Sequence, residues 1–431
     1  MRNRTLFTIA AGTLAGAAFV AAGSQGVLAA SGDDPATAPI PTYDYADPAK
    51  SFVVDLDFGI SSASVVDAVV GPDRSVSHLG DPPLLKLVLS DEDDNVLERV
   101  DAWDPRWTFV ETSGVGERME VRAGRGLLTV PFDSDSGSML VRDQVAGTDL
   151  VTVDLTGAVH EFCVAHPTDP ECVEADLAIT ASSATGTPLS VVGAAVPVSV
   201  SAVVANLGPD GPVDADVTQT AAAGAGLSVT PASSSDDVDA LAAGTPRTVT
   251  HQYAVTCNTP GSHSVVFTTT VAPQKAKVVD AVPGNNSRSA TYTVDCAVPV
   301  VLNVEPGSLK NPVQLDMGLV PMAVLSTAAG EYGLPLAFDA RKIQVSTVRI
   351  GQRTALVASN TGAPEAHGKL HLEDSYELDE VTRDGDLDAL LHGRDKLIPL
   401  TTGITEICVR GRFGPGAGTS FLGCDAVKLV P

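Results

Sequence analysis

The stretch Val203-Val204-Ala205-Asn206-Leu207-Gly208-Pro209 ends a β-rich run, residues 196–205, in a cluster of turn-forming residues. Valine favours strands because its branched side chain fits a pleated sheet, whereas Asn, Gly and Pro favour turns. Similar short runs of Val, Thr, Ala and Ser recur on both sides of this stretch, at residues 177–182, 213–220, 248–256 and 264–271. The pattern predicts a domain made of strands and tight turns.

Residues 175–298 also carry a more specific set of motifs. These are Asp176-Leu177 at the first strand, the turn Asn206-Leu207-Gly208-Pro209, Pro260-Gly261, and Pro283-Gly284-Asn285-Asn286-Ser287 before the last strand. With these motifs the segment resembles the bacterial immunoglobulin-like domains of the CARDB, or conserved-repeat, kind. The resemblance implies an Ig-like sandwich that serves as a spacer or adhesion module and has no catalytic residues to transfer.

Residues 51–162 predict a separate β-sandwich, of jelly-roll or Ig-like type, because β-rich runs alternate with turn residues. Leu85, Leu87 and Leu89 alternate as in a half-buried strand, and no helical period is sustained. The polar stretch 90–95 has the composition of a hairpin tip. The expected strands are 52–58, 84–89, 96–102, 119–123, 127–132, 139–143 and 150–155.

The terminal third, residues 300–431, carries a further series of motifs. The segment resembles a domain found at the carboxyl end of exported bacterial proteins, which implies a β-rich module with no established activity. The motifs are Val304-Glu305-Pro306-Gly307-Ser308, Gly318-Leu319-Val320-Pro321-Met322-Ala323-Val324-Leu325, Phe338-Asp339, Thr347-Val348-Arg349-Ile350-Gly351, His371-Leu372-Glu373-Asp374, Asp384-Gly385-Asp386-Leu387-Asp388, Leu391-His392, Glu406-Ile407-Cys408 and Gly423-Cys424-Asp425-Ala426-Val427.

The first 30 residues predict a Sec-type signal peptide, since Arg2 and Arg4 precede an apolar run, 6–20, and small residues stand at positions 29 and 30. Residues 31–50, rich in Asp, Pro, Ala and Thr, predict a disordered tether. No later apolar stretch predicts a membrane span once the leader is cleaved. We therefore expect an exported protein, extracellular or on the cell surface.

The chain is acidic, with 27 Lys and Arg against 53 Asp and Glu and a formal net charge of −26. Nucleic acid is excluded as a partner because phosphate binding requires clustered cations. The carboxylates leave divalent cations as candidate ligands, although most acidic residues only solvate a surface.

The six cysteines of an exported chain predict disulfides. Six cysteines allow 15 connectivities, and the local one, Cys163–Cys172, Cys257–Cys296 and Cys408–Cys424, keeps every bridge inside one segment. Residues 163–174 would then form a clipped linker. A zinc site is the weaker alternative, because no C-x-x-C pair is present.

The strongest cation motif is Asp384-Gly385-Asp386-Leu387-Asp388, since Ca²⁺ takes several oxygen ligands from alternate positions of a tight loop. Asp374 and Glu380 are the further candidate ligands. Thr382 and Arg383 stand where the family pattern expects an acidic residue and Gly, and residues 375–379 look like an insertion. The alternative is a solvated acidic turn that binds nothing.

Other candidate sites are less favoured. His367 and His371 could ligate a metal, but the surrounding stretch is loop-like. The sequence His160-Glu161 lacks the second His of a zinc protease. Asp91, Glu92, Asp93 and Asp94 favour a hairpin tip over a cation site, and Trp103 and Trp107 favour core or edge packing over stacking on a sugar or peptide.

Together these patterns predict an all-β, multi-domain, non-catalytic protein that is structural or adhesive, with an unknown protein or glycan at the cell surface as partner and Ca²⁺ as the candidate ligand. No nucleophile elbow, phosphate loop or dinucleotide motif is present. The alternative is an exported hydrolase with its active site in residues 51–162, or an accessory subunit of one.

Overall fold

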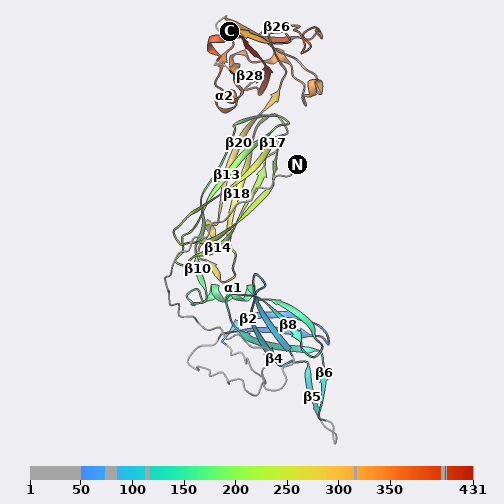
Figure 1. Cartoon of the computed structure of the whole chain (residues 1–431), viewed down its shortest axis with the longest axis vertical. Coiled ribbons are helices and arrows are strands. Elements are labelled where there is room, and N and C mark those ends of the chain that lie inside the picture. The colour runs from blue at the N-terminus through green and yellow to red at the C-terminus, as the bar shows by residue number, and fades with distance from the viewer. Residues whose placement is uncertain are drawn as a thin grey trace, which may run out of the picture. The chain divides into compact units, whose positions relative to one another are not determined.

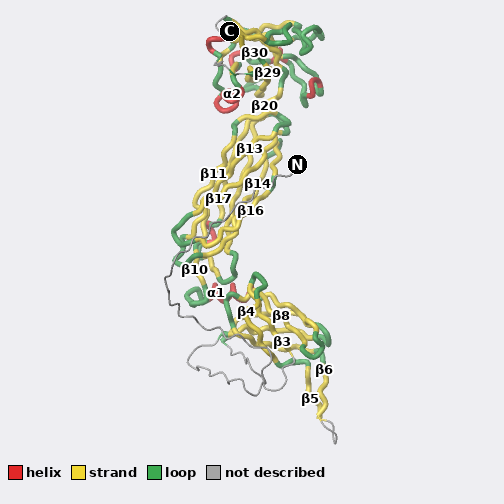
Figure 2. The backbone as a smooth tube through the Cα atoms, viewed as in Figure 1, coloured by secondary structure: helices red, strands yellow, loops and turns green. Residues whose placement is uncertain are grey.

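The computed structural model describes residues 50–72, 85–111, 117–314, 318–398, 403 and 405–430. Strands make up most of these residues and are arranged in several sheets, so the predicted all-β, multi-domain fold is confirmed (Figures 1 and 2). The predicted leader, and the predicted tether except for Lys50, lie outside the described residues. The domain boundaries, and the independent folding of the domains, stay predictions.

The first domain is a sandwich of two sheets with strand orders β2-β1-β7 and β4-β3-β8-β9, and a hairpin β5-β6 extends from it. Alternate residues of β1, from Phe52 to Phe58, are at most 1% exposed, because successive side chains of a strand point to opposite faces. Its strands are β1 Ser51–Phe58, β2 Ala63–Gly71, β3 Leu85–Asp91, β4 Val96–Ala102, β5 Trp107–Glu111, β6 Glu117–Val121, β7 Gly124–Pro131, β8 Ser136–Asp143 and β9 Thr148–Asp154.

Two strands of this domain, β2 and β5, were not predicted. Strand β2 lies at the edge of its sheet and leaves Val65, Val66 and Val69 exposed. Its valines occur in adjacent pairs, because an exposed edge strand does not need the alternation of a half-buried one. This is why the strand was not predicted. The predicted hairpin tip at residues 90–95 does join two paired strands, and the carboxylate of Asp91 accepts bonds from the backbone N–H groups of Asp93 and Asn95.

No helix was predicted in this domain, and this prediction is wrong for the residues at its end. Helix α1, Thr156–Ala165, packs Ala158, Val159 and Cys163 into the core of the first sandwich. One short apolar stripe of three residues gives too little periodicity to detect. Cys163 and its bonded partner Cys172 both belong to this core, so the start of the predicted linker is part of the first domain.

The middle domain packs a sheet β11-β13-β17-β15 against a sheet that contains β16-β14-β18-β20. Figure 1 shows the long strands β13, β17, β18 and β20, which form the antiparallel pairs β13-β17 and β18-β20. The strands are β10 Val173–Ala175, β11 Leu177–Gly186, β12 Leu189–Val191, β13 Ala195–Asn206, β14 Val213–Ala223, β15 Leu227–Thr230, β16 Ser233–Leu241, β17 Arg247–Cys257, β18 Gly261–Pro273, β19 Val278–Asp280 and β20 Ser287–Pro299.

Hydrogen bonds and one close backbone contact explain why Asn and Gly stand in the Asn-Leu-Gly-Pro turn. The side chain of Asn206 is fully buried, donates to the carbonyl of Asp210 at 2.7 Å, and accepts from the N–H groups of Gly208 at 3.0 Å and Asp176 at 3.2 Å. A Cβ atom on Gly208 would lie 2.6 Å from the backbone N of Asp176. Only glycine permits this approach, so the turn holds the first strand against the end of β13.

The C-terminal domain is built from the sheets β21-β23-β27-β26 and β29-β28-β24-β25, and Val298 of β20 pairs with Phe421 of β29. Its main core cluster includes Met322, Leu391 and Phe421, and a smaller cluster contains Val301, Ala323 and Leu325. The elements are β21 Leu302–Val304, β22 Pro312–Gln314, β23 Leu319–Val324, β24 Arg349–Gly351, helix α2 Arg353–Ser359, β25 Ala363–Pro364, β26 His371–Glu373, β27 Asp388–Arg394, β28 Glu406–Phe413, β29 Thr419–Ala426 and β30 Lys428–Val430, with short 3₁₀ turns η2 Glu331–Gly333, η3 Ala340–Lys342, η4 Val345–Thr347 and η5 Asp395–Leu397. A further 3₁₀ turn, η1 Pro283–Asn285, precedes β20 in the middle domain.

The structure holds the disulfides Cys163–Cys172, Cys257–Cys296 and Cys408–Cys424, the pairing expected from the sequence. The bridge Cys408–Cys424 joins directly opposed residues of β28 and β29. Within the part of the chain that the structure covers, neither helix has the length and apolar character needed to cross a membrane.

Candidate functional site

The acidic loop before β27 is anchored by Asp388, the first residue of that strand. Asp388 is fully buried, and its two carboxylate oxygens accept hydrogen bonds from the backbone N–H of Ser326 at 2.8 Å and of Ser375 at 3.0 Å. Gly385 in the loop has a φ of 91°, which glycine adopts without strain. The loop is thereby fixed to two segments that are distant in sequence.

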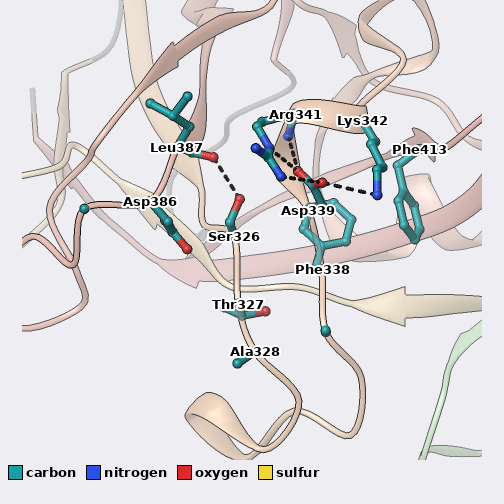
Figure 3. Close-up of a pocket in the computed structure, with 12 residues that line it drawn as sticks. Ser326, Thr327, Ala328, Phe338, Asp339, Arg341, Lys342, Asp386, Leu387 and Phe413 are labelled. Atoms are coloured by element: carbon teal, nitrogen blue, oxygen red, sulfur yellow. Dashed lines mark hydrogen bonds and ion pairs between the residues drawn. The ribbon is translucent and has the colours of Figure 1, made fainter.

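Asp386 lies beside a pocket of about 550 Å³ whose lining includes Ser326, Phe338 and Asp339 (Figure 3). Its Oδ1 atom is buried and no donor among the described residues reaches it. Burial, together with the charges of Asp388 and Asp384, raises the pKa of Asp386 to about 7. Three carboxylates therefore crowd one loop, and a bound cation would relieve their repulsion.

A fourth carboxylate, Glu377, was not predicted to belong here. Its side chain is buried, and burial and the charges of Asp384 and Asp388 raise its pKa, while the hydroxyl of Tyr332 donates to it at 2.5 Å. From the sequence, residues 375–379 were interpreted as an insertion between Asp374 and the loop. Only the packing of the chain brings Glu377 within electrostatic reach of the aspartates.

The other two predicted ligands, Asp374 and Glu380, differ in the backbone groups that their carboxylates bind. Asp374 reaches the loop, since its Oδ1 accepts from the N–H of Gly385 at 3.3 Å. Glu380 does not turn toward the aspartates: its carboxylate accepts from the N–H of Gly307 at 2.5 Å, and its charge acts on Asp425. The sequence-based grouping of Glu380 with the loop is therefore corrected.

The residues expected to weaken the site are engaged elsewhere. The guanidinium of Arg383 lies 4.3 Å from the ring centroid of Tyr376, and the hydroxyl of Thr382 donates to Asp379 at 2.7 Å. Across the pocket, Arg341 and Lys342 both pair with Asp339, as Figure 3 shows. Hydrogen bonds from Arg341 lower the pKa of Asp339 to about 2.

The raised pKa of Asp386 predicts a pH-dependent stability. Because its folded pKa of about 7 exceeds the unfolded value of about 3.9, the folded state retains the proton, so stability falls as pH rises from about 4 to about 7. Asp386→Asn should remove this dependence and stabilise the chain at pH 8 by on the order of 1 kcal/mol, since the group is only partly buried. At pH 4 the variant and the native chain should be equally stable. Urea unfolding at both pH values measures this, and a variant less stable at pH 8 would contradict it.

Three histidines lie together in the same domain. The ring centroids of His367 and His371 are 5.3 Å apart, and those of His367 and His392 are 4.6 Å apart. From the sequence, only His367 and His371 were considered as metal ligands, and ligation was the less favoured interpretation because the surrounding stretch is loop-like. His392 and the neighbouring Glu365 were not predicted to lie here, because only strand pairing brings them together.

The remaining candidates named from the sequence lie apart from the acidic loop. Trp103 is 38% exposed, and Trp107 begins the hairpin strand β5. His160 is exposed on α1. Among the described residues of the first domain, the buried charges of Asp104, Arg106 and Asp143 bind one another. They form a paired ionic network.

These features define an all-β sandwich protein of several domains with an acidic cluster in the last one. No protein-family model and no curated protein matches the chain. A CARDB domain from Pyrococcus furiosus, solved in complex with di-metal ions, is 20% identical to this chain with a TM-score of 0.19. The match covers 28% of this chain and 93% of that domain. The BSP domain of a biofilm associated protein is 8% identical over 89% of this chain and 76% of that chain, with a TM-score of 0.19.

A glycosyl hydrolase family 2 member from Bacteroides cellulosilyticus is 10% identical over 64% of this chain and 29% of that chain, with a TM-score of 0.20. At these values no property of the three proteins is transferred to this chain. The resemblance of residues 300–431 to a carboxyl-terminal domain family stays a prediction.

Proposed function

We propose that this chain is an exported, non-catalytic binding and structural protein of the cell surface or extracellular space, whose C-terminal domain binds Ca²⁺ at the acidic cluster. The cluster consists of Asp384, Asp386 and Asp388, with Asp374 and Glu377 beside them. A protein or glycan at the cell surface is the proposed partner of the sandwich domains. Three disulfides support an oxidising compartment.

The observation that carries the calcium proposal is that the charges of Asp384 and Asp388 act on Asp386, whose Oδ1 atom is buried without a donor among the described residues. Asp388 is fully buried, and Oδ1 of Asp386 is buried without a donor. Ca²⁺ takes 6–8 oxygen ligands, including carboxylates and backbone carbonyls, in flexible geometry. Oxygen atoms are the main donors that this loop offers, so Ca²⁺ fits it better than a metal that prefers nitrogen or sulfur.

Calcium affinity is expected to be that of an extracellular module, with a Kd on the order of 10⁻⁴ to 10⁻³ M. At 10 mM Ca²⁺, binding should then stabilise the folded full-length chain by about 1.4 to 2.7 kcal/mol. The melting temperature should rise by a few degrees relative to the same protein in chelator. Differential scanning calorimetry of the full chain measures this rise.

Asp386→Asn should abolish the calcium-dependent rise without unfolding the domain, because the amide keeps the shape and loses the charge. The matched control is Asp94→Asn in the acidic hairpin tip, where Asp94 is exposed and has a left-handed φ of 64° that Asn also tolerates. This control removes the same charge and should keep the full rise. Equal melting temperatures of the native chain in Ca²⁺ and in chelator would refute the calcium proposal.

A further inference from the structure

A histidine cluster separate from the acidic loop is assembled by three neighbouring segments of the C-terminal domain. Strand β26 pairs with β27, so that His371 lies opposite Leu390. His392 is two residues beyond Leu390 on β27 and thus shares a face with His371. Glu365 forms an isolated bridge with Gly393, next to His392. The loop that follows brings His367 back over the same face.

Backbone hydrogen bonds fix one side of the Glu365 carboxylate. The residue is only 6% exposed, and its Oε2 accepts from the N–H groups of His367 at 2.8 Å and Gly368 at 2.5 Å. Gly368 has a φ of 65°, which lets the loop turn back onto this carboxylate. The other oxygen, Oε1, accepts only a long 3.3 Å bond from the N–H of His392. One oxygen therefore fixes the loop, and the other is available to a ligand.

Two imidazole nitrogens lie near Oε1 of Glu365. Nδ1 of His367 lies 3.8 Å from Oε1 of Glu365, and Nδ1 of His392 lies 4.0 Å from it. The donor atoms of the three residues all lie within 4.8 Å of one another. Nδ1 of His392 is buried and has no hydrogen-bond partner in the described part of the chain. A buried nitrogen without a partner is costly unless something binds it.

We propose that Glu365, His367 and His392 bind a divalent transition-metal ion of the Zn²⁺ type, with His371 as the adjacent fourth donor. Zn²⁺ bonds to His nitrogen and carboxylate oxygen of about 2.0–2.2 Å place neighbouring tetrahedral donors about 3.3 Å apart. The two distances to Oε1, 3.8 and 4.0 Å, exceed this by about 0.5 and 0.7 Å. His367 is exposed and can close the gap on its side by rotating its side chain.

The nitrogen-rich donor set distinguishes this site from the acidic cluster. Imidazole suits Zn²⁺ and its neighbours, whereas Ca²⁺ takes oxygen. The other grouping of possible ligands, Glu406 with Cys408 and Cys424, lacks free thiols because the two cysteines are bonded to each other. The Zn²⁺ proposal does not depend on calcium binding.

The test is a Zn²⁺ titration of the full chain, stripped of metal, against a chromophoric chelator that reports free Zn²⁺. The native chain should bind one equivalent at this site. His367→Gln and His392→Gln should each weaken that binding at least about tenfold. The control His160→Gln removes an exposed histidine on α1 and should leave the affinity unchanged. Native-like Zn²⁺ binding in the double variant His367→Gln/His392→Gln would overturn the proposal.

A second measurement guards against misfolded variants, because it uses only the native chain. Co²⁺ in place of Zn²⁺ should give the intense visible absorption of a four-coordinate site, and a weak spectrum like that of hydrated Co²⁺ would overturn the proposal. Asp386→Asn should leave Zn²⁺ affinity unchanged, and the double histidine variant should keep the calcium-dependent rise in melting temperature. These crossed variants separate a failure of this site from a failure of the calcium site.

Discussion

Arg106→Ala is expected to lower the free energy of unfolding of the first domain by about 3–5 kcal/mol. The Arg106 side chain is 1% exposed, and its guanidinium binds Asp104 at 2.5 Å and Asp143 at 2.6 Å. It also donates to the carbonyl of Ile60 at 2.7 Å. Removing the cation leaves two carboxylates buried without their partner, which costs far more than the pair contributes when intact.

Urea unfolding followed by tryptophan fluorescence measures this loss. The only two tryptophans of the chain, Trp103 and Trp107, flank Arg106 in the sequence, so their emission reports this domain. The matched control is Arg125→Ala. Arg125 also pairs with an aspartate, Asp55, but its side chain is 66% exposed. Exposed pairs contribute about 1 kcal/mol or less to stability, so Arg125→Ala should have a small effect. Equal losses of unfolding free energy in the two variants would show that the buried Arg106 pairs do not stabilise the first domain.

The double variant Cys257→Ala/Cys296→Ala is expected to lose about 4 kcal/mol of stability in the middle domain. The bridge joins β17 in one sheet to β20 in the other and closes a loop of 39 residues. Both cysteines are fully buried in the core between the sheets. A long loop gains much conformational entropy in the unfolded state when its bridge is removed.

The control is Cys163→Ala/Cys172→Ala, whose bridge closes a separation of only 9 residues. The same chain-entropy relation gives about 2.5 kcal/mol for this loop. Calorimetry under non-reducing conditions compares the two losses. A smaller loss for the 39-residue loop than for the short one would rule out loop entropy as the main source of stabilisation.

Strands with regular alternation were predictable from the sequence, because one buried face imposes its period on the chain. Leu85, Leu87 and Leu89 of β3 are at most 1% exposed. Strand β2 lacked this signal because it lies at a sheet edge. Helix α1 was missed since one turn and a half of apolar contact gives no measurable period.

The candidate sites were predictable only where ligands are close in sequence. Asp384, Asp386 and Asp388 could be grouped from the sequence because they occupy alternate positions of one short loop. Glu377 was missed, and Glu380 was placed with the wrong neighbours, since the backbone turn after Asp379 sends Glu380 toward Gly307. The spacing of residues in the chain carries no information about such a turn.

The sequence by itself determined the fold class, the Gly208 turn and the local pairing of the cysteines, because each depends on residues near one another or on residue type. Tertiary structure alone decided which side chains share a site. Glu365 and His392 are 27 residues apart and meet only because β26, β27 and the preceding loop pair side by side. Strand register sets which faces coincide, and register is a property of the whole sheet.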